Sequence, residues 1–461
     1  MTNLTQVLES IDANMPQSID RLFELLRIES ISTDPEYAGE CKRAGETLVN
    51  DLKTIGFDAK LHETPGHPMV VAHHDGPEGA PHVLFYGHYD VQPVDPLELW
   101  DEPPFEPSIK EMPDGSKQMT GRGTSDDKGQ LMTFVEACRA WKSETGGLPI
   151  KVTIFFEGEE ESGSPSLIPF LEQNKDLLKA DFALVCDTGM WDRDTPAIST
   201  ALRGLLGEEI IVKAASRDLH SGMYGSAAAN PIRILTRVLA SLHDDDGRVT
   251  VPGFYEGVPE TPDDIIKMWD GLGFSEAEFL GDIGLSKPAG EAGRSVLEQV
   301  WARPTCEMNG IIGGYTGEGF KTVIPAVASA KVSFRLVGTQ DPLAIRKAFR
   351  KQVEKLIPDD CSVEFLDHGA SPAVHLGYDM PAMKKAAQAL TQEWGKDAAL
   401  IGMGGSVPVV GHFQNILEIE SLLVGFAQDD DRIHSPNEKY ELKSFHKGTR
   451  SWARIMQAFA E

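Results

Sequence analysis

Four short, continuous apolar runs constrain the fold of this chain more than any other feature. The runs are HVLFY (82–86), IKVTIFF (150–156), DFALVC (181–186) and SLLVGFA (421–427). Because apolar residues continue along each run instead of alternating with polar ones, both faces of each strand are expected to be buried. Helical patterns separate the runs, so they predict a parallel-type central sheet with flanking helices.

The pattern of apolar and polar residues changes at about residue 204. The segments GLLGEEIIVKAAS (204–216), SAKVSFRLV (329–337) and CSVEFLD (361–367) mix apolar and polar residues, as half-exposed strands do. Asn230 and Pro231 form the N-cap and first position of a predicted helix. Residues 244–304 are rich in Gly, Pro, Asp and Glu, which predicts an irregular insertion with one or two short helices.

These two sequence patterns predict a two-domain α/β protein. We expect a discontinuous catalytic domain at residues 1–203 and 373–461. Residues 204–372 are expected to form an inserted α+β domain, because the last apolar run is again continuous, like the runs of the first domain.

Charge and cysteine content narrow the possible partners and location. The chain has 43 Lys and Arg against 71 Asp and Glu, a formal charge of −28. This charge repels nucleic-acid backbones and anionic membrane surfaces, so we expect neither as a partner. The five cysteines are scattered without C-x-x-C spacing, which favours reduced thiols and a cytoplasmic protein.

A potential metal ligand follows each apolar run directly. These residues are His88 and Asp90, then Glu160 and Glu161, then Asp187, and finally His434, with Asp126 added by the glycine-rich loop GRGTSDDKG (121–129). Loops at the carboxyl ends of strands in open α/β sheets converge on one site. Imidazoles and carboxylates without a thiol suit Zn²⁺, with Mn²⁺ or Co²⁺ as alternatives.

The glutamates at 157, 159, 160 and 161 place four carboxylates within five positions. Like charges this close raise each other's pKa unless something compensates them, and a bound cation would do so. Glu157 and Glu159 receive no individual role, and we expect them to be solvated or to support the site from outside.

Nine motifs in this chain occur in the order typical of one enzyme family. They are GHYDVQPV, GRGTSDDKG, FEGEEESGS, CDTG, DLHSGMYG, KTVIPA, FRLV, GGSVPV and HSPNE. Together they extend over nearly the whole chain, which resembles the aminoacylase, carnosinase and carboxypeptidase G type of dinuclear zinc peptidases. Within that family, it is most similar to the cytosolic nonspecific dipeptidases.

The resemblance implies two bound Zn²⁺ ions and a role for each ligand. His88 and Asp187 would complete one metal site, Glu161 and His434 the other, and Asp126 would contribute to both. A carboxylate has two oxygens, so one residue can serve two neighbouring cations. The resemblance also implies a cis peptide bond after Asp126.

The resemblance further assigns catalytic residues. Asp90 would accept the second N–H of the His88 ring and fix its tautomer. Glu160 would be the general base, taking a proton from the attacking water and passing it to the leaving amine. His220 would stabilise the oxyanion in another subunit's site, across a homodimer formed by the inserted lid and dimerisation domain.

Four positions resemble the family's substrate-holding residues: Arg335, Thr322, Gly405 and Ser406. An arginine binds a terminal carboxylate in a bidentate manner, and the backbone amides of Gly405 and Ser406 offer a second anion-binding site. The implied reaction is hydrolysis of the amide bond of a small peptide, next to a free carboxylate.

Other functions stay open at this point. Met403 and Gly404 stand where several dipeptidase relatives have an acidic residue, which favours an N-acyl amino acid as the substrate of the same site. A dinuclear phosphoesterase would use similar ligands. A catalytically inactive metal-binding protein is a further alternative, although Asp126, Glu160 and His434 are all present.

Overall fold

The computed structural model describes residues 3–405 and 407–461, which divide into two compact units. Unit 1 comprises the chain up to Thr200 together with residues 376–401 and 412–461. Unit 2 comprises residues 201–375 and 402–411. None of the described helices is both long enough and apolar enough to cross a membrane.

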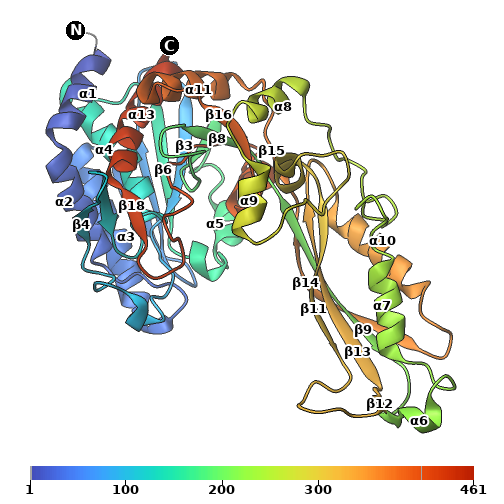
Figure 1. Cartoon of the computed structure of the whole chain (residues 1–461). Coiled ribbons are helices and arrows are strands. Elements are labelled where there is room, and N and C mark those ends of the chain that lie inside the picture. The colour runs from blue at the N-terminus through green and yellow to red at the C-terminus, as the bar shows by residue number, and fades with distance from the viewer. Residues whose placement is uncertain (1–2, 406) are drawn as a thin grey trace. The chain divides into compact units, whose positions relative to one another are not determined.

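The largest sheet has nine strands, most of them in unit 1 (Figure 1). Its order is β1-β2-β6-β3-β7-β17-β8-β15, and β16 pairs with β8. The strands are β1 (Asp58–His62), β2 (Met69–His74), β3 (His82–His88), β6 (Lys151–Glu157), β7 (Phe182–Val185), β8 (Ala197–Leu202), β15 (Val374–His375), β16 (Ala399–Met403) and β17 (Ser421–Leu423).

The four apolar runs form the centre of this sheet, as predicted. Strands β6, β3, β7 and β17 are neighbours and run parallel. The outer pairs β1-β2, β2-β6 and β17-β8 are antiparallel, so the complete sheet is mixed. The parallel strands all end at one edge of the sheet, which is where the candidate site lies.

Helices surround this sheet in unit 1, and α3 (Ala38–Ile55) and α4 (Lys128–Thr145) contact its strands directly. The others are α1 (Asn3–Ala13), α2 (Met15–Leu26), α5 (Leu167–Gln173), α11 (Pro381–Trp394) and α13 (Leu442–Ala460). A small antiparallel sheet joins β18 (Lys439–Glu441), β5 (Lys117–Thr120) and β4 (Ser108–Glu111). Gly56 ends α3 with a φ of 97°, a left-handed conformation that glycine adopts without steric cost.

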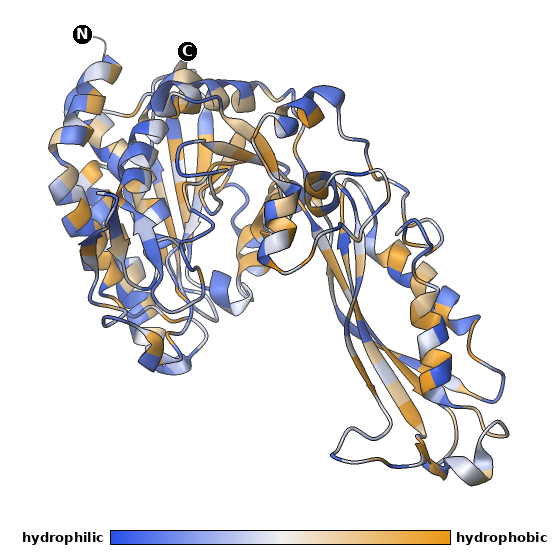
Figure 2. Cartoon of the chain, in the orientation of Figure 1, coloured by the Kyte–Doolittle hydropathy of each residue, from blue (hydrophilic) through white to orange (hydrophobic). Residues whose placement is uncertain are grey.

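An aromatic cluster fastens two helices to the central sheet. Phe85 of β3 stacks on Phe134 of α4 with ring centroids 3.8 Å apart. Trp452 of α13 meets both rings edge-on at 5.5 Å and is fully buried. Hydrophobic residues gather along these central strands (Figure 2). This packing fixes the strand ends from which the candidate ligands project.

Unit 2 contains a four-stranded antiparallel sheet in the order β11-β13-β9-β14. Its elements are β9 (Gly204–Lys213), β10 (Leu219–His220), α6 (Ser221–Tyr224), α7 (Pro231–Ala240), α8 (Asp263–Asp270), α9 (Glu276–Asp282), β11 (Thr305–Gly313), β12 (Val323–Ile324), β13 (Val327–Leu336), α10 (Pro342–Glu354) and β14 (Ser362–Ser371). The short helix α12 (Pro408–His412) begins in this unit, and β10 pairs with β12.

The local patterns predicted for this region are confirmed. Side chains of β13 alternate between buried and more exposed positions, because one face of the sheet covers the core of unit 2. The Asn230 side chain accepts a hydrogen bond from the Ile232 N–H and Pro231 opens α7. Helices α8 and α9 lie in the predicted irregular insertion.

The aromatic cluster makes a stability prediction. We expect Trp452→Ala to lower the free energy of unfolding by about 3 to 5 kcal/mol, because the fully enclosed ring leaves a cavity between helix and sheet. Urea titration followed by circular dichroism measures this change. Leu99→Ala, at a side chain that is 59% exposed, is the control and should change stability by less than about 0.5 kcal/mol. Equal effects of the two variants would contradict this prediction.

Candidate metal centre and active site

The candidate ligands of unit 1 project from neighbouring strand ends. His88 is the last residue of β3, and Asp187 lies two positions beyond β7. Glu160 and Glu161 follow β6 in a short helical turn. His434 lies in the loop between β17 and β18 with a φ of 60°. Residues that are far apart in the sequence therefore meet because their strands are adjacent and parallel.

Asp126 stands between the two histidines. Its Oδ1 lies 2.9 Å from Nε2 of His88, and its Oδ2 lies 2.9 Å from Nε2 of His434. The same His434 nitrogen is 3.2 Å from Oε2 of Glu161. Two groups of potential ligand atoms result, each within 4.8 Å: His88, Asp126 and Asp187, and Asp126, Glu161 and His434.

The charges in this cluster fit bound cations. Burial and the nearby Asp126 raise the pKa of Asp187 to about 7. Among the described residues, no group gives Asp187 a hydrogen bond or an ion pair. Asp187 is half-buried, and a carboxylate in such surroundings without a partner is costly to ionise unless a cation compensates its charge. Two imidazoles and three carboxylates without a thiol are ligands that Zn²⁺, Mn²⁺ and Co²⁺ accept.

Asp90 connects the loops after β3 and β6. Its backbone carbonyl lies 3.1 Å from Nδ1 of His88, and its carboxylate oxygen Oδ1 lies 3.4 Å from the same nitrogen. The carboxylate also accepts the backbone N–H groups of Glu160 at 3.2 Å and Glu161 at 3.0 Å. Asp90 thus lies beside the His88 ring and also orients the turn Glu160–Ser162, called the glutamate turn below.

Glu160 has the electrostatic character of a proton-transfer group. Burial raises the pKa of its carboxyl to about 8, and the negative charges of Asp187 and Glu161 add to this shift. A carboxyl whose pKa lies near neutral pH can both take and return a proton there. Its neighbour Glu161 instead lies beside His434 and accepts a hydrogen bond from the Gln92 side chain at 2.7 Å.

Glu157 and Glu159 are not solvated, contrary to the first of the two expectations for them. Both are buried, at 0% and 1% exposure. Glu157 is the last residue of β6 and accepts the Tyr86 hydroxyl at 2.7 Å. Glu159 accepts the backbone N–H of His67 at 2.6 Å. Their carboxylates therefore bond to residues on either side of the glutamate turn rather than to solvent.

The loop that carries Asp126 is organised around Glu438, which sequence reasoning missed. This carboxylate is completely buried and accepts three backbone N–H groups, from Gly123 at 2.9 Å, Ser125 at 2.9 Å and Asp126 at 3.1 Å. It also accepts the Arg122 side chain at 2.8 Å. In the sequence, only the position of Glu438 at the end of the motif HSPNE points to a part in the site.

The peptide bond between Asp126 and Asp127 is cis, as predicted. Oδ2 of Asp127 accepts the backbone N–H of His88 at 3.1 Å. The loop and the end of β3 are therefore joined directly.

The other candidate residues lie in unit 2. His220 and Thr322 are neighbours: β10 pairs with β12, and the Ser221 N–H donates to the Thr322 carbonyl at 3.0 Å. The His220 side chain is exposed, with Nδ1 accepting the Gly222 N–H at 3.0 Å. Arg335 lies on β13, and Gly405 lies in the loop after β16.

Ser406 lies outside the described residues. The structure thus gathers His88, Asp90, Asp126, Glu160, Glu161, Asp187 and His434 within unit 1, whereas the described substrate-holding candidates and His220 belong to unit 2.

Known proteins with similar sequences span this whole chain. The Cys-Gly metallodipeptidase DUG1 of Saccharomyces cerevisiae is 29% identical over 480 residues, covering 100% of this chain and 98% of that protein. The Beta-Ala-His dipeptidase of Homo sapiens is 26% identical over 476 residues, covering 99% and 93%.

Solved structures agree with the sequence comparison. An M20 family metallo-carboxypeptidase from Sulfolobus solfataricus superimposes with a TM-score of 0.80 at 29% identity, covering 96% of this chain and 99% of that one. The crystal structure of human carnosine dipeptidase 1 gives a TM-score of 0.77 at 26% identity, covering 100% and 99%.

A family model described as peptidase family M20/M25/M40 matches residues 84–458. The match includes every residue of the candidate site and confirms the resemblance to metallopeptidases drawn from the motifs. The chain therefore belongs to the peptidase family M20/M25/M40.

Proposed function

We propose that this chain is a dipeptidase that hydrolyses the amide bond of small peptides with the help of two bound Zn²⁺ ions. The observation that carries the proposal is the Asp126 carboxylate, whose two oxygens each face one imidazole within a cluster of further carboxylates. Relatives named Cys-Gly metallodipeptidase and Beta-Ala-His dipeptidase match this chain over nearly its full length, which supports a dipeptide as substrate.

Each ion would be held by three side chains. His88, Asp126 and Asp187 would hold one ion, and Asp126, Glu161 and His434 the other, with Mn²⁺ or Co²⁺ as alternatives to zinc. When bound, such ions supply Lewis-acid polarisation and charge stabilisation at the scissile carbonyl.

Glu160 would carry the proton transfers. Its raised pKa, close to 8, suits a carboxylate that takes a proton from the attacking water and then returns it to the leaving amine. Asp90 keeps Glu160 in place through the backbone N–H of that residue. Glu161, on the same turn, stays available to the second metal group.

Substrate recognition would come from unit 2. A guanidinium such as that of Arg335 binds a terminal carboxylate in a bidentate manner, and Gly405 and Thr322 are further candidates for contacts with the peptide. An N-acyl amino acid has the same carboxylate and amide bond, so it remains the alternative substrate of this site.

A homodimer formed through unit 2 is part of the proposal. Strand β11 is an edge strand with exposed apolar side chains, including Ile311 at 59% and Ile312 at 64% exposure. Met223 at 74% and Phe320 at 91% exposure lie next to β10 and β12 in sequence. Exposed apolar residues along an edge strand favour association. His220 would then act in the partner's site.

A cytoplasmic location fits the cysteines. All five are free thiols, and four of them are buried. Reducing surroundings keep such thiols in this form.

Replacing Glu160 by Gln tests the reaction. We expect kcat for dipeptides to fall by about 10²- to 10⁴-fold, because the amide cannot accept the proton of the attacking water. Steady-state assays with Zn²⁺ and Mn²⁺ measure the loss, and Glu172→Gln on the exposed surface of α5 is the control. A fully active Glu160→Gln enzyme would disprove the general-base role. Parallel assays with N-acetyl amino acids decide between the two substrate classes.

Metal analysis tests the shared ligand. We expect two equivalents of Zn²⁺ per wild-type chain, one equivalent in Glu161→Ala, and none in Asp126→Ala. Mass spectrometry of the purified proteins measures the bound metal. The hydrogen bond with Asp126 raises the pKa of His434 to about 10, whereas a ligating imidazole must be neutral. Metal uptake should therefore release protons and weaken as the pH falls. One equivalent in Asp126→Ala would contradict a shared carboxylate.

Mixed dimers test the role of His220. We expect His220→Ala and Glu160→Gln proteins each to be nearly inactive and to regain up to about one quarter of wild-type activity after mixing and subunit exchange, because one site in the hybrid contains both native residues. Unmixed samples at the same concentrations are the control. Absence of recovery, despite hybrids seen by native mass spectrometry, would exclude action across the dimer.

A further inference from the structure

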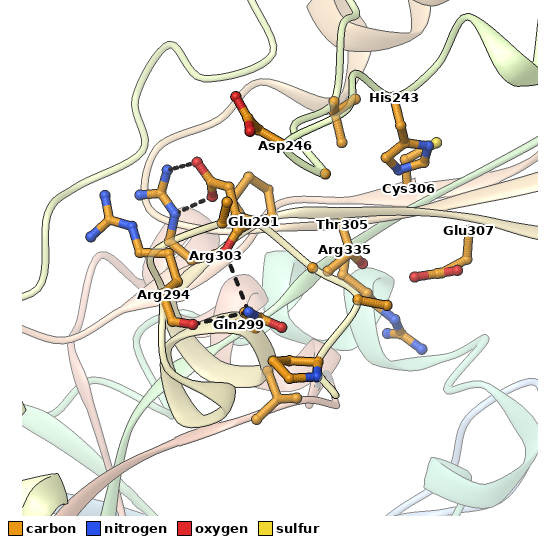
Figure 3. Close-up of a pocket in the computed structure, with 18 of the residues that line it drawn as sticks. His243, Asp246, Glu291, Arg294, Gln299, Arg303, Thr305, Cys306, Glu307 and Arg335 are labelled. Atoms are coloured by element: carbon orange, nitrogen blue, oxygen red, sulfur yellow. Dashed lines mark hydrogen bonds and ion pairs between the residues drawn. The ribbon is translucent and has the colours of Figure 1, made fainter. Parts of the chain in front are cut away.

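A large pocket in unit 2 is lined by Arg335 together with a second arginine, Arg203, that the proposed function does not use. The pocket has a volume of about 970 Å³, and Arg203, Arg335 and Glu307 are among the residues that line it. In Figure 3 the guanidinium of Arg335 points away from Asp246 and Glu291 and lies on the side of the pocket that carries Glu307, whereas Arg294 and Arg303 lie beside Glu291.

Two of the pocket's arginines are already neutralised. Arg303 donates two hydrogen bonds to Glu291, at 2.7 and 2.9 Å. Arg294 forms ion pairs with Glu260 at 2.7 Å and with Glu298 at 3.1 Å. These pairs hold their guanidinium groups in the wall of the pocket.

Arg203 and Arg335 differ from those two residues. Within the described part of the chain, neither guanidinium has an ion-pair partner, although Glu307 lines the same pocket. Burial lowers the pKa of Arg203 to about 10, and the positive charge of Arg335 adds to that shift, while the negative charge of Glu307 partly opposes it. Two neighbouring guanidinium groups without an ion-pair contact carry more positive charge than the single carboxylate of Glu307 balances, so in a protein with a net charge of −28 they form a site suited to an anion.

Arg203 also forms hydrogen bonds with the loop that contains Gly404 and Gly405. Its backbone N–H donates to the carbonyl of Gly405 at 3.2 Å, and its side-chain Nε donates to the carbonyl of Gly404 at 3.1 Å. A Cβ atom added at Gly404 would lie 3.1 Å from Nη2 of Arg203, so the guanidinium packs closely over this loop. With Nε occupied, the terminal nitrogens stay available to a ligand.

We propose that Arg203 is a second carboxylate-binding residue, which grips the C-terminal carboxylate of the substrate together with Arg335 and holds the Gly404–Gly405 loop beside it. The proposal rests on the proposed function, and it adds a specificity-determining residue to that site. A planar guanidinium with five N–H donors can serve the loop carbonyl and a carboxylate at the same time.

The test compares a dipeptide with its C-terminal amide, which lacks the carboxylate. For Arg203→Met we expect kcat/KM for the dipeptide to fall by about 10- to 100-fold, mainly through KM, and that for the amide to fall much less. The preference for a free carboxylate would therefore collapse. Arg294→Met, which removes a neutralised arginine of the same pocket, is the control and should keep the wild-type preference.

Equal losses of kcat/KM for dipeptide and amide would overturn the proposal, because Arg203 would then only support the loop. Thermal unfolding establishes that the variant is folded. If Arg203→Met does not fold, Arg203→Lys replaces it: the charge remains, the planar grip is lost, and the preference should still fall by about 10-fold. An unchanged preference in Arg203→Lys would then reject the proposal.

The two proposals fail in different ways. A wild-type enzyme that cleaves no dipeptide would remove the proposed function itself. A wild-type enzyme that cleaves dipeptides and their amides equally well would leave the function standing and remove only the role of Arg203.

Discussion

The Asp126 carboxylate, enclosed between two imidazoles, is the interaction on which the rest of the active-site region depends. Burial would raise its pKa, but hydrogen bonds with His434 and His88 outweigh burial and hold the pKa below its ordinary value. Asp126 therefore stays charged among other carboxylates, although like charges at such distances oppose one another. That concentration of negative charge is the physical reason for proposing two divalent cations here.

The surrounding structure keeps this charged cluster in place with backbone groups. Glu438 accepts three N–H groups of one loop, including that of Asp126, and Asp90 accepts those of Glu160 and Glu161. Each buried carboxylate thus satisfies its hydrogen bonds while fixing a loop that carries a ligand. Beneath them, the parallel strands and the aromatic cluster around Trp452 give these loops a rigid base.

The residues proposed for chemistry and those proposed for substrate recognition belong to different units. The potential metal ligands and Glu160 belong to unit 1, whereas Arg203, Arg335 and Gly405 belong to unit 2. The same hydrolytic centre can therefore serve different substrates when the second unit changes, because a fold does not by itself determine what is cleaved. Arg203 and Arg335, which have no ion-pair partner among the described residues, are the reason for proposing substrates with a free carboxylate.

The sequence by itself determined the central parallel strands and the candidate ligands, because continuous apolar runs and the residue types that follow them are local features of the chain. It did not reveal that Glu157 and Glu159 are buried, since their letters are the same as those of Glu160 and Glu161. Only the tertiary structure revealed the contacts of Glu438 and Arg203. Each acts on backbone groups from distant parts of the chain, and no local pattern records which distant groups a folded chain brings within hydrogen-bonding distance.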